Sequence, residues 1–218
     1  MEVTEVKKTG RRYTLRIGGE TIRVAGSVFE ERPLAAGDEV DLEEYDNWLL
    51  LRQYRPAMEY ALNLLARRAF AEGELKQRIR RVGYRPLTAD MVCHKLKTVG
   101  VLDDADFARQ WVEGQLGRGI GSRRIARELS MKGVTREEAE EAMADTDAAE
   151  AEAACALAEK GLRRAKNGED PRKTNQRVLA LLARRGYDYN TAKTALARAK
   201  ERLGSGDETE DGEDLFND

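Results

Sequence analysis

The chain has 218 residues, a net charge of −2 and a charged fraction of 36%, which is typical of a globular protein whose helices have broad solvated faces. Two cysteines and one histidine are too few for a disulfide framework or a zinc site. No apolar run could span a membrane, and the first residues contain no apolar signal region, so we expect a cytoplasmic protein with no metal and no cofactor.

Residues 1–54 are expected to form a small β-rich module. The segment RRYTLRIGGETIRV alternates apolar and polar residues on both sides of a Gly-Gly pair, which is a strong hairpin signal. The preceding VTEVKK could add a third strand, and a sheet of this size needs a cover for its apolar face. We expect a helix over residues 40–51 to provide it with Leu42, Trp48 and Leu49.

From about residue 57 onward the apolar residues follow a helical period, and three segments align with one another. Gly83, Gly133 and Gly186 each follow an amphipathic helix, and each glycine suits the left-handed position that ends a helix. Four and eight positions before the glycines stand apolar residues on one helix face, namely Leu75, Ile79, Ile125, Leu129, Val178 and Leu182.

The alignment predicts a mainly α fold in which three tandem three-helix repeats follow the N-terminal β-hairpin or three-stranded module. A unit of about fifty residues buries too little apolar surface alone, so the repeats should stack into an elongated, curved solenoid. We place the repeats at residues 55–102, 103–146 and 147–203.

Each repeat needs a start for its third helix. Thr135 with Glu138 forms a capping box, and Thr88 and Asn190 are candidates for the other two caps. The tail over residues 204–218 has seven acidic residues and no basic one, and we expect it to be disordered.

The stretch GRGIGSRR, residues 117–124, has the glycine spacing of a phosphate-binding loop but not its context. Such a loop follows a strand, and its Walker form ends in Lys-Ser/Thr, whereas this one follows a helical stripe and continues into arginines. We interpret it as a helix-to-helix turn in which Ser122 can cap the next helix. A nucleotide-using enzyme remains an alternative that rests on this turn alone.

Asp103 and Asp104 stand immediately before a helical stripe. Capping and stabilisation of the helix dipole explain them better than catalysis does, because no nucleophile, base or metal ligand set accompanies them. We therefore expect no enzymatic activity. Phe107 and Trp111 have the spacing of core residues. Tyr187 and Tyr189 are better candidates for stacking on bases, and the alternative is that they only pack a turn against the last helix.

Basic residues gather at corresponding places in the repeats, and residues 57–134 contain 15 Lys and Arg against 9 Asp and Glu. They are either a solvated helix face or an electropositive surface that contacts a polyanion or an acidic protein. Nothing marks a helix that reads bases, so DNA contact would be non-specific. The candidate binding residues are Arg78, Arg80, Arg81, Arg118, Arg123, Arg124, Arg127, Lys132, Arg184 and Arg185.

Residues 100–134, GVLDDADFARQWVEGQLGRGIGSRRIARELSMKGV, resemble the RecX family of bacterial regulators of the RecA recombinase. The pattern consists of a Leu-Asp-Asp-x-x-Phe helix, a basic-Gly-x-Gly turn, Arg-Ile-x-x-Glu-Leu and Lys-Gly-Val. With ALNLLARRAFAEGELKQRIRRVGY and RVLALLARRGYDYNTAKTAL the resemblance covers about residues 57–203. The leading hairpin is similar to an extension found in a subset of the family.

The sequence departs from the family pattern at two helix starts. Ala71 stands where the family often has serine, so an N-cap of about 1 kcal/mol is expected to be absent. Ser122 stands where proline is common.

The resemblance implies a monomer whose partners are the RecA filament and DNA, single-stranded DNA first and double-stranded DNA as a further candidate. It implies binding along the filament groove and inhibition of filament growth, ATP hydrolysis, strand exchange and co-protease activity. Arg123, Arg124 and Arg127 would then contact RecA carboxylates or DNA. A non-specific DNA-binding module without a recombinase partner is the alternative.

Overall fold

The computed structural model describes residues 1–164 and 170–207. The chain divides into two compact units, Met1–Phe107 and Ala108–Asp218, each with its own hydrophobic core. Helices make up most of the described part, and its strands all precede residue 26. The mainly α fold with a small N-terminal sheet is therefore confirmed.

The N-terminal sheet contains β1 (Val3–Thr9), β2 (Arg12–Ile17) and β3 (Glu20–Ala25), antiparallel and in that order. The predicted hairpin and its third strand are thus both present. Gly18 and Gly19 have φ of +57° and +88°, the positive values that a type I′ turn requires at both central residues.

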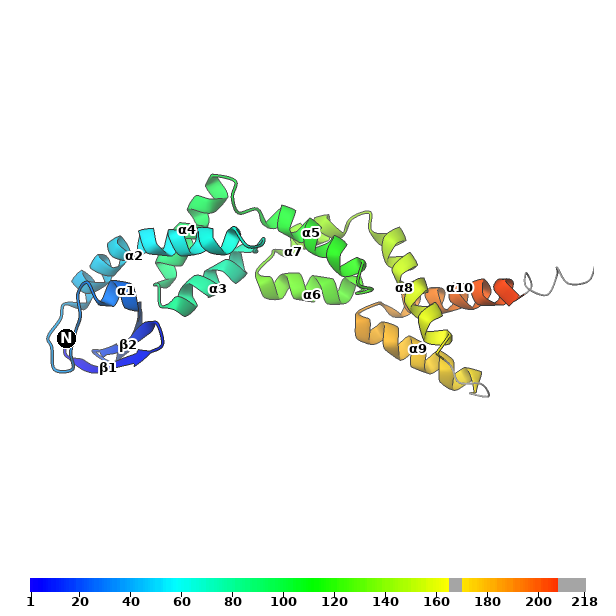
Figure 1. Cartoon of the computed structure of the whole chain (residues 1–218), viewed down its shortest axis with the longest axis horizontal. Helices are drawn as coiled ribbons and strands as arrows, with labels where there is room; N and C mark the ends of the chain where they lie inside the picture. The colour runs from blue at the N-terminus through cyan, green and yellow to red at the C-terminus, as the bar shows by residue number, and fades with distance from the viewer. Residues whose placement is uncertain (165–169, 208–218) are drawn as a thin grey trace, which may run out of the picture. The chain divides into compact units, whose positions relative to one another are not determined.

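One face of the sheet packs against α2 (Leu42–Leu65), with the short α1 (Gly26–Phe29) beside it, as Figure 1 shows. The predicted cover over residues 40–51 is confirmed, because Leu49 is fully buried in the same core as the sheet.

A first repeat that begins at residue 55 requires a helix of its own from about residue 57, and its expected separation from the helix over residues 40–51 is wrong. The two expected helices form the single helix α2, which runs through Pro56. Its buried residues recur every four positions across the proline, as a continuous stripe formed by Tyr45, Leu49, Gln53, Ala57 and Ala61. Burial along this stripe offsets the roughly 3 kcal/mol that an interior proline costs a helix.

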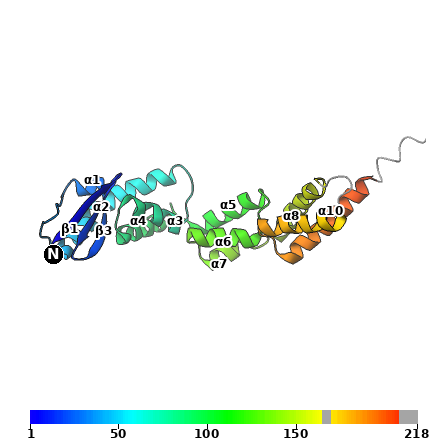
Figure 2. The ribbon, with the colours of Figure 1, turned by 90° about the horizontal axis from the view of Figure 1, so that it is seen from below.

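The first repeat continues with α3 (Glu72–Val82) and α4 (Pro86–Thr98). Gly83 ends α3 with φ of +113°, and a Cβ there would lie 2.8 Å from the carbonyl carbon of Val24 in β3. The end of α3 therefore touches the backbone of the sheet, and Figure 2 shows β3 on the side of α3 and α4.

The later elements are α5 (Asp104–Leu116), α6 (Ser122–Lys132), α7 (Arg136–Met143), α8 (Asp147–Leu162), α9 (Pro171–Arg185) and α10 (Tyr189–Asp207). Gly133 ends α6 and Gly186 ends α9, both left-handed with φ of +87° and +96°. The alignment of the three glycines is therefore confirmed. All six aligned apolar residues are buried, as predicted.

Of the three predicted helix caps, the structure confirms the capping box of Thr135 and Glu138 but not the caps at Thr88 and Asn190. The capping box of Thr135 and Glu138 is present at α7. Asn190 does not cap α10, because the carboxylate of Asp188 accepts from the backbone N–H groups of Asn190 and Thr191.

Thr88 does not cap α4 either. It is fully buried, and its hydroxyl donates to Oε1 of Gln53 in α2. The residue at the N-cap position of α4 is Arg85. In the tail, α10 extends to Asp207, and residues 208–218 lie outside the described residues.

Candidate polyanion-binding surface

Helix α6 presents arginines on the face opposite to its core contacts. Ile125 and Leu129, four residues apart, are fully buried. Arg123 and Arg127 are also four residues apart and are exposed, so their side chains lie about one helical turn apart on the solvent side of α6. Within residues 1–164 and 170–207 neither guanidinium forms an ion pair with a carboxylate. Arg127 is therefore available to a ligand, and so is Arg123, whose charge also helps to lower the pKa of the Asp188 carboxyl.

Arg124 differs from its neighbours. Its Nε donates to Oε1 of Glu128 over 2.9 Å, and Nε2 of Gln115 donates to the other oxygen of that carboxylate over 2.9 Å. The charge of Arg124 is therefore balanced within α6, and its side chain is held along the helix.

The first turn of α6 contains two arginines and no acidic residue. Positive charge at a helix N-terminus opposes the helix dipole and costs about 0.3–1 kcal/mol per residue. A carboxylate from α8 offsets part of this cost, because Oε1 of Glu150 accepts the N–H of Ser122 over 2.8 Å and Glu150 is 7% exposed. Arg124 recovers part of the cost through its ion pair with Glu128. Arg123 forms no ion pair within α6, so its charge does not stabilise its own helix, which is typical of functional positions.

The glycine turn before α6 joins it to the end of α9. Gly121 donates its N–H to the carbonyl of Arg185 over 2.9 Å, and Arg123 donates its N–H to the carbonyl of Gly186 over 3.2 Å. The positive end of one helix dipole therefore faces the negative end of the other. A Cβ at Gly121 would lie 2.5 Å from the backbone nitrogen of Tyr187, so a larger residue could not make this approach.

The helix-to-helix interpretation of GRGIGSRR is confirmed, but the role expected of Ser122 is wrong. Gly121 occupies the N-cap position and Ser122 is the first helical residue. The acceptor that the helix start needs comes from Glu150, 28 residues away in the sequence.

The remaining candidates of the second unit also include exposed residues without an ion pair and residues that contact other groups of the protein. Arg118 and Arg184 are exposed, and neither forms an ion pair within the described ranges. Arg185 is half-buried and donates from Nη1 to the carbonyl of Arg118 over 3.0 Å. Lys132 lies over the ring of Trp111, with its Nζ 4.2 Å from the centroid. Arg185 and Lys132 are therefore partly engaged inside the protein.

The candidates of the first repeat are mostly paired. Arg78 lies 3.8 Å from Glu74, and Arg80 lies 3.4 Å from Asp90. Arg81 is exposed and forms no ion pair in the part of the chain that the structure describes. Such exposed pairs are worth about 0–1 kcal/mol, so a polyanion could still compete for Arg78 and Arg80.

The aromatic candidates for base stacking are reduced to one. Phe107 is buried, as its core spacing predicts. Tyr187 is also buried, and its burial raises the pKa of its hydroxyl to about 12, so the prediction that it could stack on a base is wrong. Tyr189 is 68% exposed and could meet a ligand.

The acidic pair at the start of α5, Asp103 and Asp104, has two separate structural roles. Asp103 caps its own helix as expected, since its Oδ1 accepts the N–H of Asp106 over 3.0 Å. Asp104 instead caps α3, because it accepts the N–H of Glu72 over 2.7 Å and pairs with Nζ of Lys97 at 3.1 Å. The cap that Ala71 cannot supply therefore comes from the next repeat.

Residues 1–164 and 170–207 provide no metal site and no membrane-spanning helix, and their buried Cys93 is not a reactive cysteine. There, no three His, Cys, Asp or Glu side chains are arranged to hold a metal ion. None of the helices in that part has the length and apolar character needed to cross a membrane. Cys93 is buried, which raises the pKa of its thiol to about 12 and makes it a poor nucleophile.

Two features of the structure were not predicted from the sequence. The bond between Glu150 and Ser122 has no local signal, because it joins residues far apart in the chain. The second feature is a group of cations at the β1–β2 turn, where Lys8, Arg11 and Arg12 line a hollow with Arg81. The sequence KKTGRR, with four basic residues around a turn glycine, was the signal for it.

Comparison with protein families finds three matches that follow the three repeats. Residues 57–96 match the family model described as RecX, first three-helix domain. Residues 103–143 match the second three-helix domain, and residues 148–196 match the third.

Curated relatives and solved structures agree with these matches. Regulatory protein RecX of Mycobacteroides abscessus is 40% identical over 152 residues, which cover 67% of this chain and 74% of the relative. Regulatory protein RecX of Mycolicibacterium smegmatis is 38% identical over 155 residues, or 67% and 82% of the two chains. A crystal structure of regulatory protein RecX has a TM-score of 0.61 at 22% sequence identity, and the match covers 88% of this chain and 97% of that structure. The crystal structure of RecX from Lactobacillus salivarius has a TM-score of 0.63 at 21% sequence identity, and the match covers 69% of this chain and 98% of that structure.

Proposed function

The chain belongs to the RecX family, and on this premise we propose that it is a non-enzymatic regulator that binds the RecA–DNA filament. It acts in the cytoplasm as a monomer and without a cofactor. It opposes filament growth, ATP hydrolysis, strand exchange and co-protease activity, and thereby modulates recombinational DNA repair and the SOS response.

The observation that carries this proposal is the arginine face of α6. Arg123 and Arg127 are exposed and unpaired within the described residues, and Arg123 lies in a helix turn where its charge is unfavourable. Guanidinium groups form strong, bidentate hydrogen bonds with carboxylates and phosphates. Both groups are expected on a filament of protein and DNA, so this face suits contact with either.

Repetition of the three-helix unit supports binding to a repeating partner. Once one repeat is bound, further repeats add contacts at a high effective concentration. Arg118 and Arg184 are exposed near the joint of α6 with α9 and extend the cationic surface of the second unit. Arg124 contributes less, because Glu128 already balances its charge.

The proposal is tested with the ATPase activity of RecA on circular single-stranded DNA. The protein is added at amounts substoichiometric to both RecA and the binding sites on DNA, at physiological salt. We expect progressive inhibition, and we expect the variant Arg123→Glu/Arg127→Glu to need at least about tenfold more protein for half inhibition, the scale of losing one charge-assisted hydrogen bond.

A matched control reverses two exposed arginines of other helices of the same unit, Arg172→Glu in α9 and Arg198→Glu in α10, which form no ion pair within the described residues. It changes the net charge equally and should inhibit like the parent protein. If the α6 variant inhibits as strongly as this control, the α6 face does not bind the filament. If RecA stays fully active until the DNA is saturated, the chain is instead a simple DNA-binding module.

A further inference from the structure

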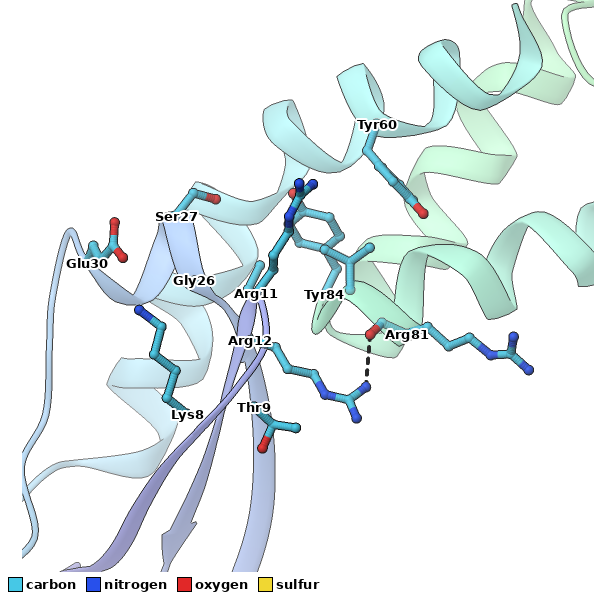
Figure 3. Close-up of a pocket in the computed structure, with 13 residues that line it drawn as sticks. Lys8, Thr9, Arg11, Arg12, Gly26, Ser27, Glu30, Tyr60, Arg81 and Tyr84 are labelled. Carbon is cyan, nitrogen blue, oxygen red and sulfur yellow. Dashed lines mark hydrogen bonds between the residues drawn. The ribbon is translucent and has the colours of Figure 1, made fainter. Parts of the chain in front are cut away.

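The first unit contains a hollow of about 730 Å³ between the β1–β2 turn, the start of α1 and the end of α3. Its volume lies within the range of about 300–1,000 Å³ that is usual for ligand pockets. Figure 3 shows the hollow, with Lys8, Arg11 and Arg12 on the β1–β2 hairpin and Tyr60 and Tyr84 on the helical side. Much of its wall comes from residues 8–30, which precede the three matched domains.

The backbone holds the turn in place. Gly10 has φ of +64°, which fits the first central position of a two-residue type II′ hairpin turn. The N–H of Gly26 donates to the carbonyl of Arg11 over 2.8 Å, and a Cβ at Gly26 would lie 2.9 Å from that oxygen. The position of Arg11 is therefore fixed by a close approach that glycine alone permits.

The cations of the hollow are only partly compensated. Nη1 of Arg12 donates to the carbonyl of Arg81 at the end of α3 over 2.9 Å, which orients this guanidinium without neutralising it. Arg11 forms no ion pair within the described residues. Glu30 is the one acidic residue among the described lining residues. The hollow therefore carries an excess of positive charge that favours an anion.

The opposite wall is aromatic and hydroxylated. Tyr60 is half-buried in α2, and its side chain projects toward the hollow in Figure 3. Tyr84 also lines the hollow, and its burial raises the pKa of its hydroxyl. Proteins that bind single strands combine cations along the backbone with aromatic rings that meet the bases.

We propose that this hollow is a second binding site that holds a phosphodiester group of single-stranded nucleic acid on Arg11 and Arg12, with the adjoining base against Tyr60. The concave shape admits one nucleotide unit, whereas the bases of a duplex are stacked inside the helix and could not reach Tyr60. An acidic polypeptide would use the cations but would leave the tyrosine wall unexplained. The site contacts the sugar-phosphate chain and is indifferent to base identity.

The test measures the fluorescence anisotropy of a fluorescein-labelled oligothymidylate across a salt series, with the full chain and no RecA present. Arg11→Glu should weaken binding about tenfold at low salt, the scale of losing a hydrogen bond to a charged group. The slope of log K against log salt should become shallower by about 0.7 for each phosphate that the variant no longer binds. Arg11 is exposed in a turn, so the variant should fold, which circular dichroism checks.

The matched control is Arg23→Glu, an equal charge change at an exposed residue of β3 that does not line the hollow. If both variants weaken binding equally, or neither does, there is no site in the hollow. If Arg11→Glu instead weakens binding of a labelled oligoglutamate and leaves oligothymidylate binding intact, the ligand is an acidic polypeptide and the proposal is wrong.

A second readout tests the tyrosine wall. An oligothymidylate with one 5-iodouracil is photo-crosslinked to the protein, and the crosslinked peptide is identified by mass spectrometry. We expect the peptide that contains Tyr60, and crosslinks confined to the second unit would contradict the site. The assays contain no RecA, so their failure and the failure of filament regulation are separate results.

Discussion

At the scale of single residues, two buried carboxylates act across repeat boundaries. Asp104 of the second repeat is 3% exposed and caps α3 of the first, and Glu150 of the third repeat caps α6 of the second. A helix start leaves N–H groups without intrahelical partners, and each carboxylate satisfies one of them. These bonds connect the repeats as well as stabilising the helices.

Replacing Asp104 by Ala should lower the free energy of unfolding by about 2 kcal/mol. The substitution leaves the N–H of Glu72 without its acceptor and removes a partner of Lys97, and losses of this kind cost about 1–3 kcal/mol. Asp104→Asn keeps an oxygen for the N–H and should cost less. Urea denaturation followed by circular dichroism compares the two, and equal stability of all three proteins would show that the bond is unimportant.

The candidate binding residues could be predicted only in part. The exposure of Arg123 and Arg127 follows from the amphipathic spacing of α6, which is a local property of the sequence. The internal role of Arg185 could not be predicted, because its acceptor is a backbone carbonyl 67 residues away. The hollow could not be predicted for a similar reason, since it forms only when the hairpin turn meets the end of α3.

At the scale of elements, the end of one helix is fitted against the start of another. The joint between α9 and α6 places the backbone of Gly186 against Arg124, so that a Cβ at Gly186 would lie 2.8 Å from the backbone nitrogen of Arg124. The glycines that end α3, α6 and α9 could be predicted from the sequence, because the signal for a helix end is local. It consists of a glycine that follows apolar residues spaced four apart. It did not reveal the joint, because the two helices are distant in sequence.

Gly186→Ala should destabilise the protein by about 2 kcal/mol or more, since alanine would face both a φ of +96° and a close backbone contact. Gly114→Ala in α5 is the control, because a Cβ at Gly114 would have no neighbouring atom within 4 Å. That change should raise stability by about 0.5–1 kcal/mol through helix propensity. Thermal melting distinguishes the two, and equal effects would contradict a tight joint.

At the scale of the whole molecule, charge is distributed unevenly along the sequence. Basic residues exceed acidic ones in residues 57–134, and the last fifteen residues carry only acidic charges. An acidic tail has the same sign of charge as nucleic acid, so we expect it to compete with nucleic acid for the cationic surfaces when salt is low.

Removal of residues 208–218 leaves α10 complete at Asp207 and should strengthen binding of free single-stranded DNA at low salt. The gain should disappear at high salt, where both interactions are screened. Titration of labelled oligothymidylate with the full and the shortened chain measures this, and unchanged affinity at low salt would show that the tail does not compete.

Two helices receive their caps from residues that are synthesised later, in the next repeat. While the chain emerges from the ribosome, α3 is not fully capped until Asp104 has been made, and α6 is not fully capped until Glu150 has been made. The last repeat depends on no successor, because Asp170 caps its own helix α9 by accepting the N–H of Arg172. A chain that stops before Glu150 therefore contains α6 without the carboxylate that accepts the N–H of Ser122, a loss of about 0.5–2 kcal/mol for that helix.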